Sequence, residues 1–318
     1  MRIVVIGGYG RIGSYLVPKL VKAGHQVMCV SRGKSKPYTA TDYAWKEVEQ
    51  VTLDRKNEQK GVFEQKVAAL QADVVVDLIC FSLESTKGMV EALKHTNLSH
   101  YLFCSSIWVH GKPIFLPITE DMPKYPLDNY GIEKHKSEQF LHQCFRNEDF
   151  PETVVMPGQI SGRGWNIINP VGNLDLDVFS RIRRGEETVI PNFGMETLHH
   201  VHADDVAQVF FNAIAHREAA LGQSFHAVGT ESITLLGYAQ AMYRYFGKEE
   251  KIKFLSWEAW CDYTKDEKHI EKTYYHIARS GHFSIEKGRR LINYYPRHTL
   301  LETIEESVTY MVEQKWFD

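Results

Sequence analysis

Short runs of apolar, β-branched residues alternate with amphipathic stretches through the first half of the chain. Such continuous apolar runs predict buried strands, because a parallel sheet is covered by helices on both faces. The predicted strands are Arg2–Ile6, Gln26–Ser31, Asp73–Ile79, Tyr101–Ser106 and Thr153–Met156. The helical spacing of apolar residues predicts helices at Arg11–Ala23, Thr86–His95 and Asn129–Phe145. This order of strand and helix is typical of a Rossmann-type, doubly wound parallel sheet of the α/β class.

The rhythm changes after Pro157. Residues 158–194 are rich in Gly, Pro and Asn and contain one helical stretch, Asp175–Gly185. A strand at Thr197–His202 and a helix at Asp204–Ala215 are predicted next, and the remainder is expected to be mainly helical. We therefore expect a dinucleotide-binding domain at residues 1–165, to which 196–228 return. A smaller, mainly helical substrate-binding lobe would comprise residues 166–195 and 229–318.

Three glycines, Gly7, Gly10 and Gly13, follow the first predicted strand at a spacing of three. A pyrophosphate reaches backbone N–H groups only where the turn is tight and the helix packs closely on the strand. Glycines also serve ordinary turns, but their place at the first strand–helix junction predicts a dinucleotide site. The residues assigned to this turn are Gly7, Gly8, Tyr9, Gly10, Arg11, Ile12 and Gly13.

The end of the second predicted strand selects the cofactor. An acid there would bind the ribose 2′-OH of NAD, whereas an arginine accommodates the 2′-phosphate of NADP. This chain has no acid there, and Ser31 and Arg32 open a basic loop that runs to Lys36. The cofactor is therefore expected to be NADP or NAD, with NADP modestly favoured. The alternative interpretation is a solvated basic loop.

Tyr130 and Lys134 lie four residues apart in a predicted helix, so they share one face. A lysine cation beside the phenol is expected to lower its pKa, which suits a general acid/base. Upstream, Ser105 and Ser106 end a predicted strand and would point into the ligand crevice at its carboxyl end. Ser105 and the nearby Trp108 are candidate substrate contacts. The alternatives are a surface Tyr/Lys pair and serines that merely cap the strand.

Together these segments resemble the extended short-chain dehydrogenase/reductases of the NAD-dependent epimerase/dehydratase family. The resemblance covers residues 1–230 and also rests on the segments Ser105–Gly111, Met156–Gly162 and Val201–Ala207. It implies that Ser106, Tyr130 and Lys134 are catalytic, with Lys134 also holding the nicotinamide ribose. The further cofactor-binding residues that it implies are Asp54, Ile79, Cys80, Phe81, Pro157, Gly158 and Ile160. A homodimer through the Tyr130 helix is also expected from the family.

The chain departs from the family pattern at several positions. His110 replaces the usual tyrosine, and Ile107 and Trp108 stand where dehydratases carry an Asp-Glu pair. Dehydration is therefore disfavoured, which leaves an epimerase or an oxidoreductase acting on a sugar or nucleotide-sugar. Some members of the broader group, chloroplast RNA-associated proteins, share the glycine-rich start and the basic loop. The alternative function is accordingly a non-catalytic, NADP-binding regulatory or RNA-associated protein.

A run of histidines and acids between His199 and Asp205 invites a metal interpretation. Asp204 is better placed as the N-cap of the following helix, so no metal is predicted. His200 and Trp165 are candidate substrate contacts. Arg181, Arg183 and Arg184, with His199, either grip an anionic group or end a helix where cations are favourable.

Composition narrows the class of protein. The 318 residues carry a formal net charge of −3, so no global basic field favours nucleic acid or an anionic membrane. The five cysteines are scattered without CxxC spacing, and no apolar run is long enough to span a bilayer. The apolar run in the first ten residues is too short for a signal peptide. We expect a reduced, cytoplasmic protein.

Overall fold

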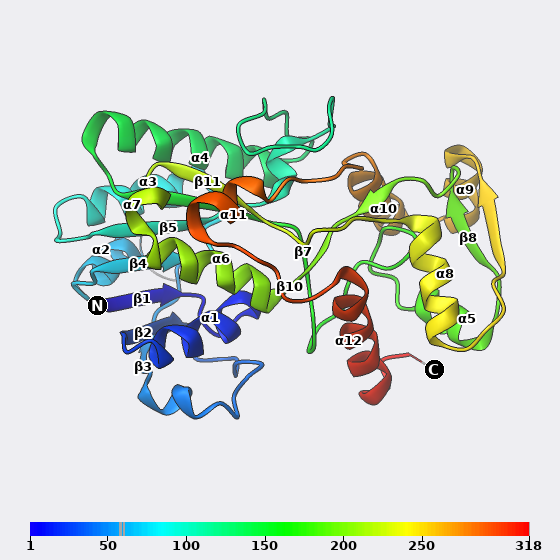
Figure 1. Cartoon of the computed structure of the whole chain (residues 1–318), viewed down its shortest axis with the longest axis horizontal. Coiled ribbons are helices and arrows are strands. Elements are labelled where there is room, and N and C mark those ends of the chain that lie inside the picture. The colour runs from blue at the N-terminus through cyan, green and yellow to red at the C-terminus, as the bar shows by residue number, and fades with distance from the viewer. Residues whose placement is uncertain (57–58, 60, 318) are drawn as a thin grey trace.

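A parallel sheet forms the centre of the molecule in the computed structural model, which describes residues 1–56, 59 and 61–317 (Figure 1). Its seven strands have the order β11-β6-β5-β4-β1-β2-β3, and every neighbouring pair is parallel. These strands are β1 (Arg2–Ile6), β2 (Gln26–Ser31), β3 (Glu49–Thr52), β4 (Val74–Asp77), β5 (His100–Cys104), β6 (Glu152–Pro157) and β11 (Gln223–Ala227). The predicted Rossmann-type fold is confirmed.

Helices cover both faces of this sheet. Helix α1 packs on α6, and α3 packs on α2 and α4. The helices that surround the sheet are α1 (Arg11–Lys22), α2 (Val62–Ala68), α3 (Leu83–Leu93), α4 (Asn129–Glu148), α6 (Ala203–Ala215), α7 (Arg217–Ala220) and α11 (Glu286–Ile292). Two 3-10 helices, Tyr43–Glu47 and Ile107–His110, follow β2 and β5.

The C-terminal region forms a second body beside the sheet, on the right of Figure 1. Its helices are α5 (Asp177–Arg184), α8 (Leu235–Tyr245), α9 (Trp257–Thr264), α10 (Glu267–Ile277) and α12 (Leu300–Glu313). Three two-stranded sheets accompany them, formed by β7 (Gln159–Ser161) with β10 (His200–His202), β8 (Thr188–Pro191) with β13 (Ile252–Leu255), and β9 (Thr197–Leu198) with β12 (Ile233–Thr234). A separate buried cluster, which includes Trp165, Tyr238 and Trp260, forms its core.

One predicted strand needs correction, and two strands of the sheet were not predicted. The predicted strand Thr197–His202 is two short strands, β9 and β10, which pair in different sheets. Edge strand β3 was not predicted, because its residues are largely polar and exposed. Strand β11 was missed because buried polar side chains, Ser224 and His226, interrupt its apolar pattern. Among the described residues, no helix is long and apolar enough to cross a membrane.

Candidate active site

The glycine turn after β1 packs too tightly for side chains. A Cβ on Gly13 would lie 2.4 Å from Cα of Gly8, and one on Gly8 would lie 2.2 Å from Sγ of Cys29. Gly7 has φ +84°, a left-handed conformation that favours glycine. The start of α1 therefore lies directly against the end of β1, as a dinucleotide pyrophosphate requires.

A cavity of about 670 Å³ opens beside this turn. Its walls come from the ends of β1, β2 and β4 and from the loop after β3. Sequence-predicted residues that line it are Gly7, Tyr9, Gly10, Ser31, Arg32, Asp54, Ile79 and Phe81. Lining residues that were not assigned to the site include Lys34, Lys36, Tyr38, Arg55, Lys56, Phe63 and Ser85. Because the lining combines the glycine turn with the ends of β1 and β2, it fits the adenosine half of such a cofactor.

Other predicted cofactor residues lie elsewhere. The Cys80 side chain is fully buried against Thr86 and does not line the cavity. Ile12, Gly8 and Gly13 are buried beneath the turn. Arg11 places its guanidinium 4.8 Å from the ring centroid of Trp165. Pro157, Gly158 and Ile160 lie at the end of β6 and in β7, outside the walls of this cavity.

Exposed cations surround the cavity mouth. Arg32, Lys34, Lys36 and Lys56 have no ion pair within the part of the chain that the structure describes. Arg55, by contrast, lies inward and forms an ion pair with the buried carboxylate of Asp77 at 2.5 Å. The rim is therefore positively charged, and its free charge is concentrated in the loop after β2.

The three predicted catalytic residues lie together at the carboxyl edge of the sheet. The ring of Tyr130 lies 6.4 Å from that of Phe81 and 5.9 Å from the indole of Trp108, centroid to centroid. The ammonium of Lys134 lies 5.7 Å from the Tyr130 ring centroid. Ser106 ends the loop after β5, and its Oγ accepts a hydrogen bond from the backbone N–H of Trp108 at 3.2 Å.

Lys134 is completely enclosed. Its ammonium donates to the carbonyl oxygens of Cys80 at 2.6 Å and Cys104 at 2.5 Å. Cys104 is the last residue of β5 and Cys80 follows the end of the neighbouring β4, so the lysine joins the carboxyl ends of the two strands. Burial lowers the pKa of Lys134 from its ordinary value.

The predicted lowering of the phenol pKa is wrong for the protein without its cofactor. Desolvation raises the pKa of Tyr130 above its ordinary value, the nearby Cys104 adds to this, and a hydrogen bond with Ser106 acts in the opposite direction. The Lys134 ammonium is engaged by two carbonyls.

A second cavity, of about 600 Å³, lies against Tyr130. Trp108 and the start of α4 form one side, and α10 forms the other. Its lining residues are Trp108, Asp128, Asn129, Tyr130, Leu174, Lys268, His269, Glu271, Lys272 and Tyr275. Only Trp108 and Tyr130 of this set were singled out from the sequence. The α10 residues were missed because helical spacing alone does not show which face meets a distant tyrosine.

Three predicted substrate contacts are buried and lie outside both cavities. Ser105 is buried and bonds to the carboxylate of Glu138. Trp165 is 4% exposed, and its Nε1 donates to the carbonyl of Ile160 at 3.1 Å. His200 is 1% exposed and bonds through Nδ1 to Ser161 at 2.6 Å. None of the three lines either cavity described above.

The predicted arginine patch is paired internally. Arg181 lies 3.1 Å from a carboxylate oxygen of Asp177, Arg183 donates to the carbonyl of Phe317, and Arg184 pairs with Glu186. His199 is buried, and its Nε2 accepts from the backbone N–H of Phe283. Each of these groups therefore already has a partner within the protein.

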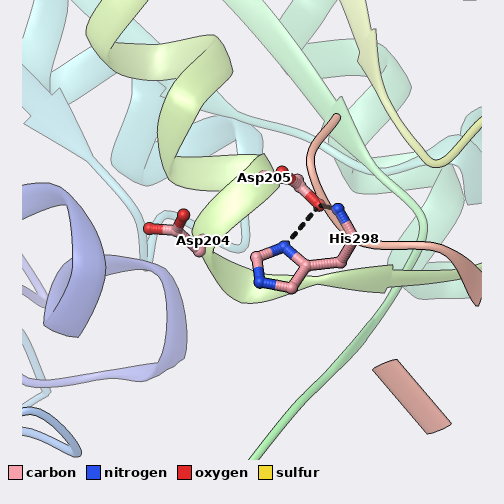
Figure 2. A group of neighbouring side chains, drawn as sticks. All are labelled: Asp204, Asp205 and His298. Carbon is pink, nitrogen blue, oxygen red and sulfur yellow. Dashed lines mark hydrogen bonds and ion pairs between the residues drawn. The ribbon is translucent and has the colours of Figure 1, made fainter. Parts of the chain in front are cut away.

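Asp204, Asp205 and His298 bring three potential metal-ligand atoms within 4.8 Å of one another. Figure 2 shows His298 bonded to Asp205, while Asp204 points away from that pair. The Asp205 carboxylate already accepts three hydrogen bonds, from the backbone of Arg297 and from the backbone and ring of His298. Asp204 is paired with Lys19 at 2.7 Å. These contacts join the start of α6 to the segment before α12, and we call this group the His298 clasp.

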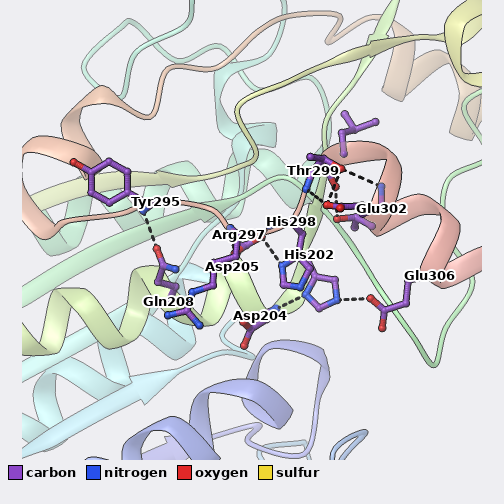
Figure 3. Close-up of polar contacts among 12 residues, drawn as sticks. His202, Asp204, Asp205, Gln208, Tyr295, Arg297, His298, Thr299, Glu302 and Glu306 are labelled. Carbon is purple, nitrogen blue, oxygen red and sulfur yellow. Dashed lines mark hydrogen bonds and ion pairs between the residues drawn. The ribbon is translucent and has the colours of Figure 1, made fainter.

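The N-cap of α6 also differs from the prediction. His202 is the N-cap, and its Nδ1 accepts from the backbone N–H of Asp204 at 3.0 Å. The His202 ring stacks on His298 at 3.8 Å, and its Nε2 lies 2.9 Å from Glu306 in α12 (Figure 3). The N-cap therefore lies two residues before the predicted Asp204, and its imidazole accepts from the N–H of the second helical residue.

Comparison with known proteins decides the family. Residues 3–227 match the model of the NAD dependent epimerase/dehydratase family. The chain belongs to this family. The relatives that are similar to this chain differ in the functions for which they are named.

Among curated relatives, the chloroplast stem-loop binding protein of 41 kDa b from Arabidopsis thaliana is 27% identical over 96% of this chain and 78% of its own. The UDP-glucose 4-epimerase of Lactobacillus helveticus is 30% identical over 51% of this chain and 52% of its own. The solved structure of UDP-glucuronic acid 4-epimerase from Bacillus cereus, in complex with NAD, superposes with a TM-score of 0.73. It is 19% identical and 99% of each chain is covered, so this likeness shows the fold.

Proposed function

We propose that this chain is an NAD(P)-dependent epimerase or oxidoreductase that acts on a sugar or nucleotide-sugar. The position of Tyr130 supports the proposal most directly. Its ring contacts Phe81, a wall residue of the first cavity, and forms part of the wall of the second. A general acid/base at this position adjoins both the first cavity, proposed for the cofactor, and the second cavity, proposed for the substrate.

The residues of the first cavity and the glycine turn fit a dinucleotide and would hold it by backbone N–H groups and by the basic rim. The nicotinamide, when bound, supplies the hydride acceptor and donor. Tyr130 takes the proton of the substrate hydroxyl, and Ser106 holds the same oxygen by a hydrogen bond. Lys134 supplies positive charge behind the phenol, which favours the deprotonated form once the site is filled.

A sugar or nucleotide-sugar is proposed because similar solved structures include UDP-sugar epimerases and because the second cavity has aromatic walls, Trp108 and Tyr275. Dehydration remains disfavoured. Ile107 and Trp108, which follow Ser106, offer neither the acid nor the base that elimination needs.

We propose NADP over NAD as the cofactor. A 2′-phosphate carries negative charge that the unpaired cations of the rim would neutralise, and β2 ends in Ser31 without an acid to bind a 2′-OH. Tighter binding of NAD, the nucleotide present in the epimerase structure above, is the competing outcome.

The test is replacement of Tyr130 by Phe. The protein is incubated with NADP⁺ and, separately, UDP-glucose, UDP-galactose and UDP-glucuronate, and products are followed by proton NMR and absorbance of reduced cofactor. We expect the variant to lose about 10²-fold or more of the wild-type rate. Tyr125→Phe is the matched control, because Tyr125 is 60% exposed and lies outside both cavities. Full turnover by Tyr130→Phe would refute the mechanism.

A second candidate function is an RNA-associated role. The Arabidopsis relative is named for stem-loop binding, and the unpaired rim cations Arg32, Lys34 and Lys36 offer contacts to phosphate. An electrophoretic shift with a stem-loop RNA at physiological salt, with and without saturating NADP⁺, separates the two. A salt-sensitive shift that NADP⁺ removes would place both ligands on the same rim, whereas no shift weighs against the RNA role.

A further inference from the structure

Arg279 connects the C-terminal body to the catalytic edge of the sheet. It follows α10 and is 7% exposed. Its guanidinium lies 3.9 Å from the ring centroid of Trp108, and its Nη2 lies 3.0 Å from Oδ1 of Asp128. Its Nη1 donates to the carbonyl of Tyr275, which fixes the plane of the guanidinium. A planar cation that stacks on an aromatic ring and pairs with a carboxylate is a geometry that lysine does not reproduce.

Both partners of Arg279 hold the first turn of α4, where Tyr130 lies. Asp128 is the N-cap of this helix, and its Oδ1 accepts from the backbone N–H of Gly131 at 2.9 Å. A Cβ on Gly131 would lie 2.9 Å from the carbonyl oxygen of Trp108, so the first turn of α4 packs closely against Trp108. The indole of Trp108 then meets the Tyr130 ring at 82°. Movement of either partner would move the phenol.

The charge of Arg279 also acts on the phenol. Asp128 is one of the groups that raise the pKa of Tyr130, because a nearby negative charge disfavours a phenolate. The guanidinium offsets that charge at a distance of 3.0 Å. Without it, Asp128 would keep an uncompensated charge beside the start of α4.

Direct ligand binding does not account for this arginine. The small cavity that Arg279 lines with Gln159, Thr197 and His199 holds about 10 Å³, room for roughly one water. The larger cavity beside Tyr130 does not include Arg279 in its wall. The Arg279 contacts are to protein groups, and two of them, with Trp108 and Asp128, lead to Tyr130.

We propose that Arg279 is a positioning residue for Tyr130, which it holds through the stacked Trp108 and the N-cap Asp128 across the boundary between the two bodies. The inference rests on the proposed catalytic role of Tyr130. It predicts that a change at Arg279, in the C-terminal body, alters the Tyr130 phenol even when no ligand bridges the two bodies.

The test reads the phenol directly and needs no substrate. Position 130 of the full chain carries 2,3,5-trifluorotyrosine, whose fluorines bring the phenol pKa into a range where the protein stays folded, and ¹⁹F NMR follows it against pH. In Arg279→Met we expect the apparent pKa to rise by about half a unit, as Coulomb's law gives for one charge at roughly 10 Å in an effective dielectric of about 50. Adding Asp128→Asn to Arg279→Met should return the apparent phenol pKa toward the wild-type value.

Arg279→Lys keeps the charge and loses the stacked plane. We expect its pKa to stay near wild type while the ¹⁹F resonance broadens or splits, because Trp108 is no longer held. Arg183→Met, which removes an arginine that donates to Phe317, is the control and should change neither. A merely structural arginine would lower the melting temperature without this charge-specific reversal by Asp128→Asn.

An unchanged pKa and a single unchanged resonance in Arg279→Met would overturn the proposal. If Arg279→Met does not fold, as circular dichroism would show, an unchanged resonance in Arg279→Lys overturns it instead. A protein that shows the predicted shifts yet has no turnover would contradict the proposed function while the Arg279–Tyr130 coupling stands.

Discussion

The ammonium nitrogen of Lys134 lies 2.6 Å from the carbonyl oxygen of Cys80, completely enclosed at the carboxyl edge of the sheet. A second bond, of 2.5 Å, runs to the carbonyl of Cys104. The residue that the family resemblance assigns to the nicotinamide ribose is therefore also a bridge between β4 and β5 in the protein alone.

Lys134→Met should destabilise the protein, because it leaves the Cys80 and Cys104 carbonyls buried without a donor. One such unsatisfied group costs about 1–3 kcal/mol of unfolding free energy, which urea denaturation measures. Lys136→Met is the control, since Lys136 forms an exposed pair with Glu133 that contributes at most about 1 kcal/mol. Equal losses in the two variants would show that the buried bridge contributes nothing.

Gly13→Val should prevent cofactor binding and weaken the fold. The new Cβ would meet backbone atoms of Gly8 at 2.4 Å, so the start of α1 must move away from β1, at a cost of about 1–3 kcal/mol. Gly229→Ala is the control, because its Cβ meets the carbonyl oxygen of His200 at an ordinary 3.6 Å. Thermal unfolding and NADPH fluorescence measure the two effects. Undiminished NADPH affinity in Gly13→Val would count against the glycine turn as the site.

Arg32→Glu should weaken NADP⁺ binding more than NAD⁺ binding. A charge-assisted hydrogen bond to a phosphate contributes about 1.5–3 kcal/mol, so the NADP⁺ dissociation constant should rise by roughly 10- to 150-fold. Lys253→Glu, an exposed lysine of β13 outside the rim, serves as the control for net charge. Isothermal titration with both nucleotides provides the ratio, and tighter binding of NAD⁺ by the wild-type protein would contradict the NADP proposal.

The clasp at His298 should make stability depend on pH. A hydrogen bond with Asp205 raises the pKa of His298, and Asp204 and Glu306 act in the same direction. Since the folded pKa lies above the unfolded value of about 6.5, the stabilisation is fully present below pH 6.5 and is lost as pH rises through the folded pKa.

Urea unfolding at several pH values between 5.5 and 8.5 tests this clasp. The wild-type protein should lose more unfolding free energy over that range than His298→Gln, which keeps a side-chain donor but does not titrate. Every other ionisable group is the same in the two proteins, so their difference isolates His298. Parallel pH profiles in the two proteins would exclude the ion pair as a stabilising contact.

The sequence predicted the central sheet because its inner strands are continuously apolar. The bounds of β1 and β2 agree with the prediction residue for residue, since both strands are buried among parallel neighbours and begin and end at polar residues or turns. Strands β3 and β11 lie at the two edges and carry polar side chains, so their pattern gave no such signal.

The site was predictable where chemistry follows from local spacing. Tyr130 and Lys134 share a helix face, and the glycine turn lies at a single junction. The burial of Ser105 and Trp165 could not be predicted, because their partners, Glu138 and Ile160, are fixed by packing that spacing does not reveal. Arg279 lies about 150 residues beyond Asp128 and was missed for the same reason.

Direct binding of the nicotinamide nucleotide tests the central claim. The purified protein is examined by absorbance and mass spectrometry, native and denatured, and is then titrated with NADPH while the fluorescence of the nucleotide is followed. We expect one nucleotide per chain, either retained through purification or bound reversibly, and no binding by Gly13→Val. A folded wild-type protein that binds neither NADPH nor NADH under any condition would contradict the proposed enzyme and leave the RNA-associated role.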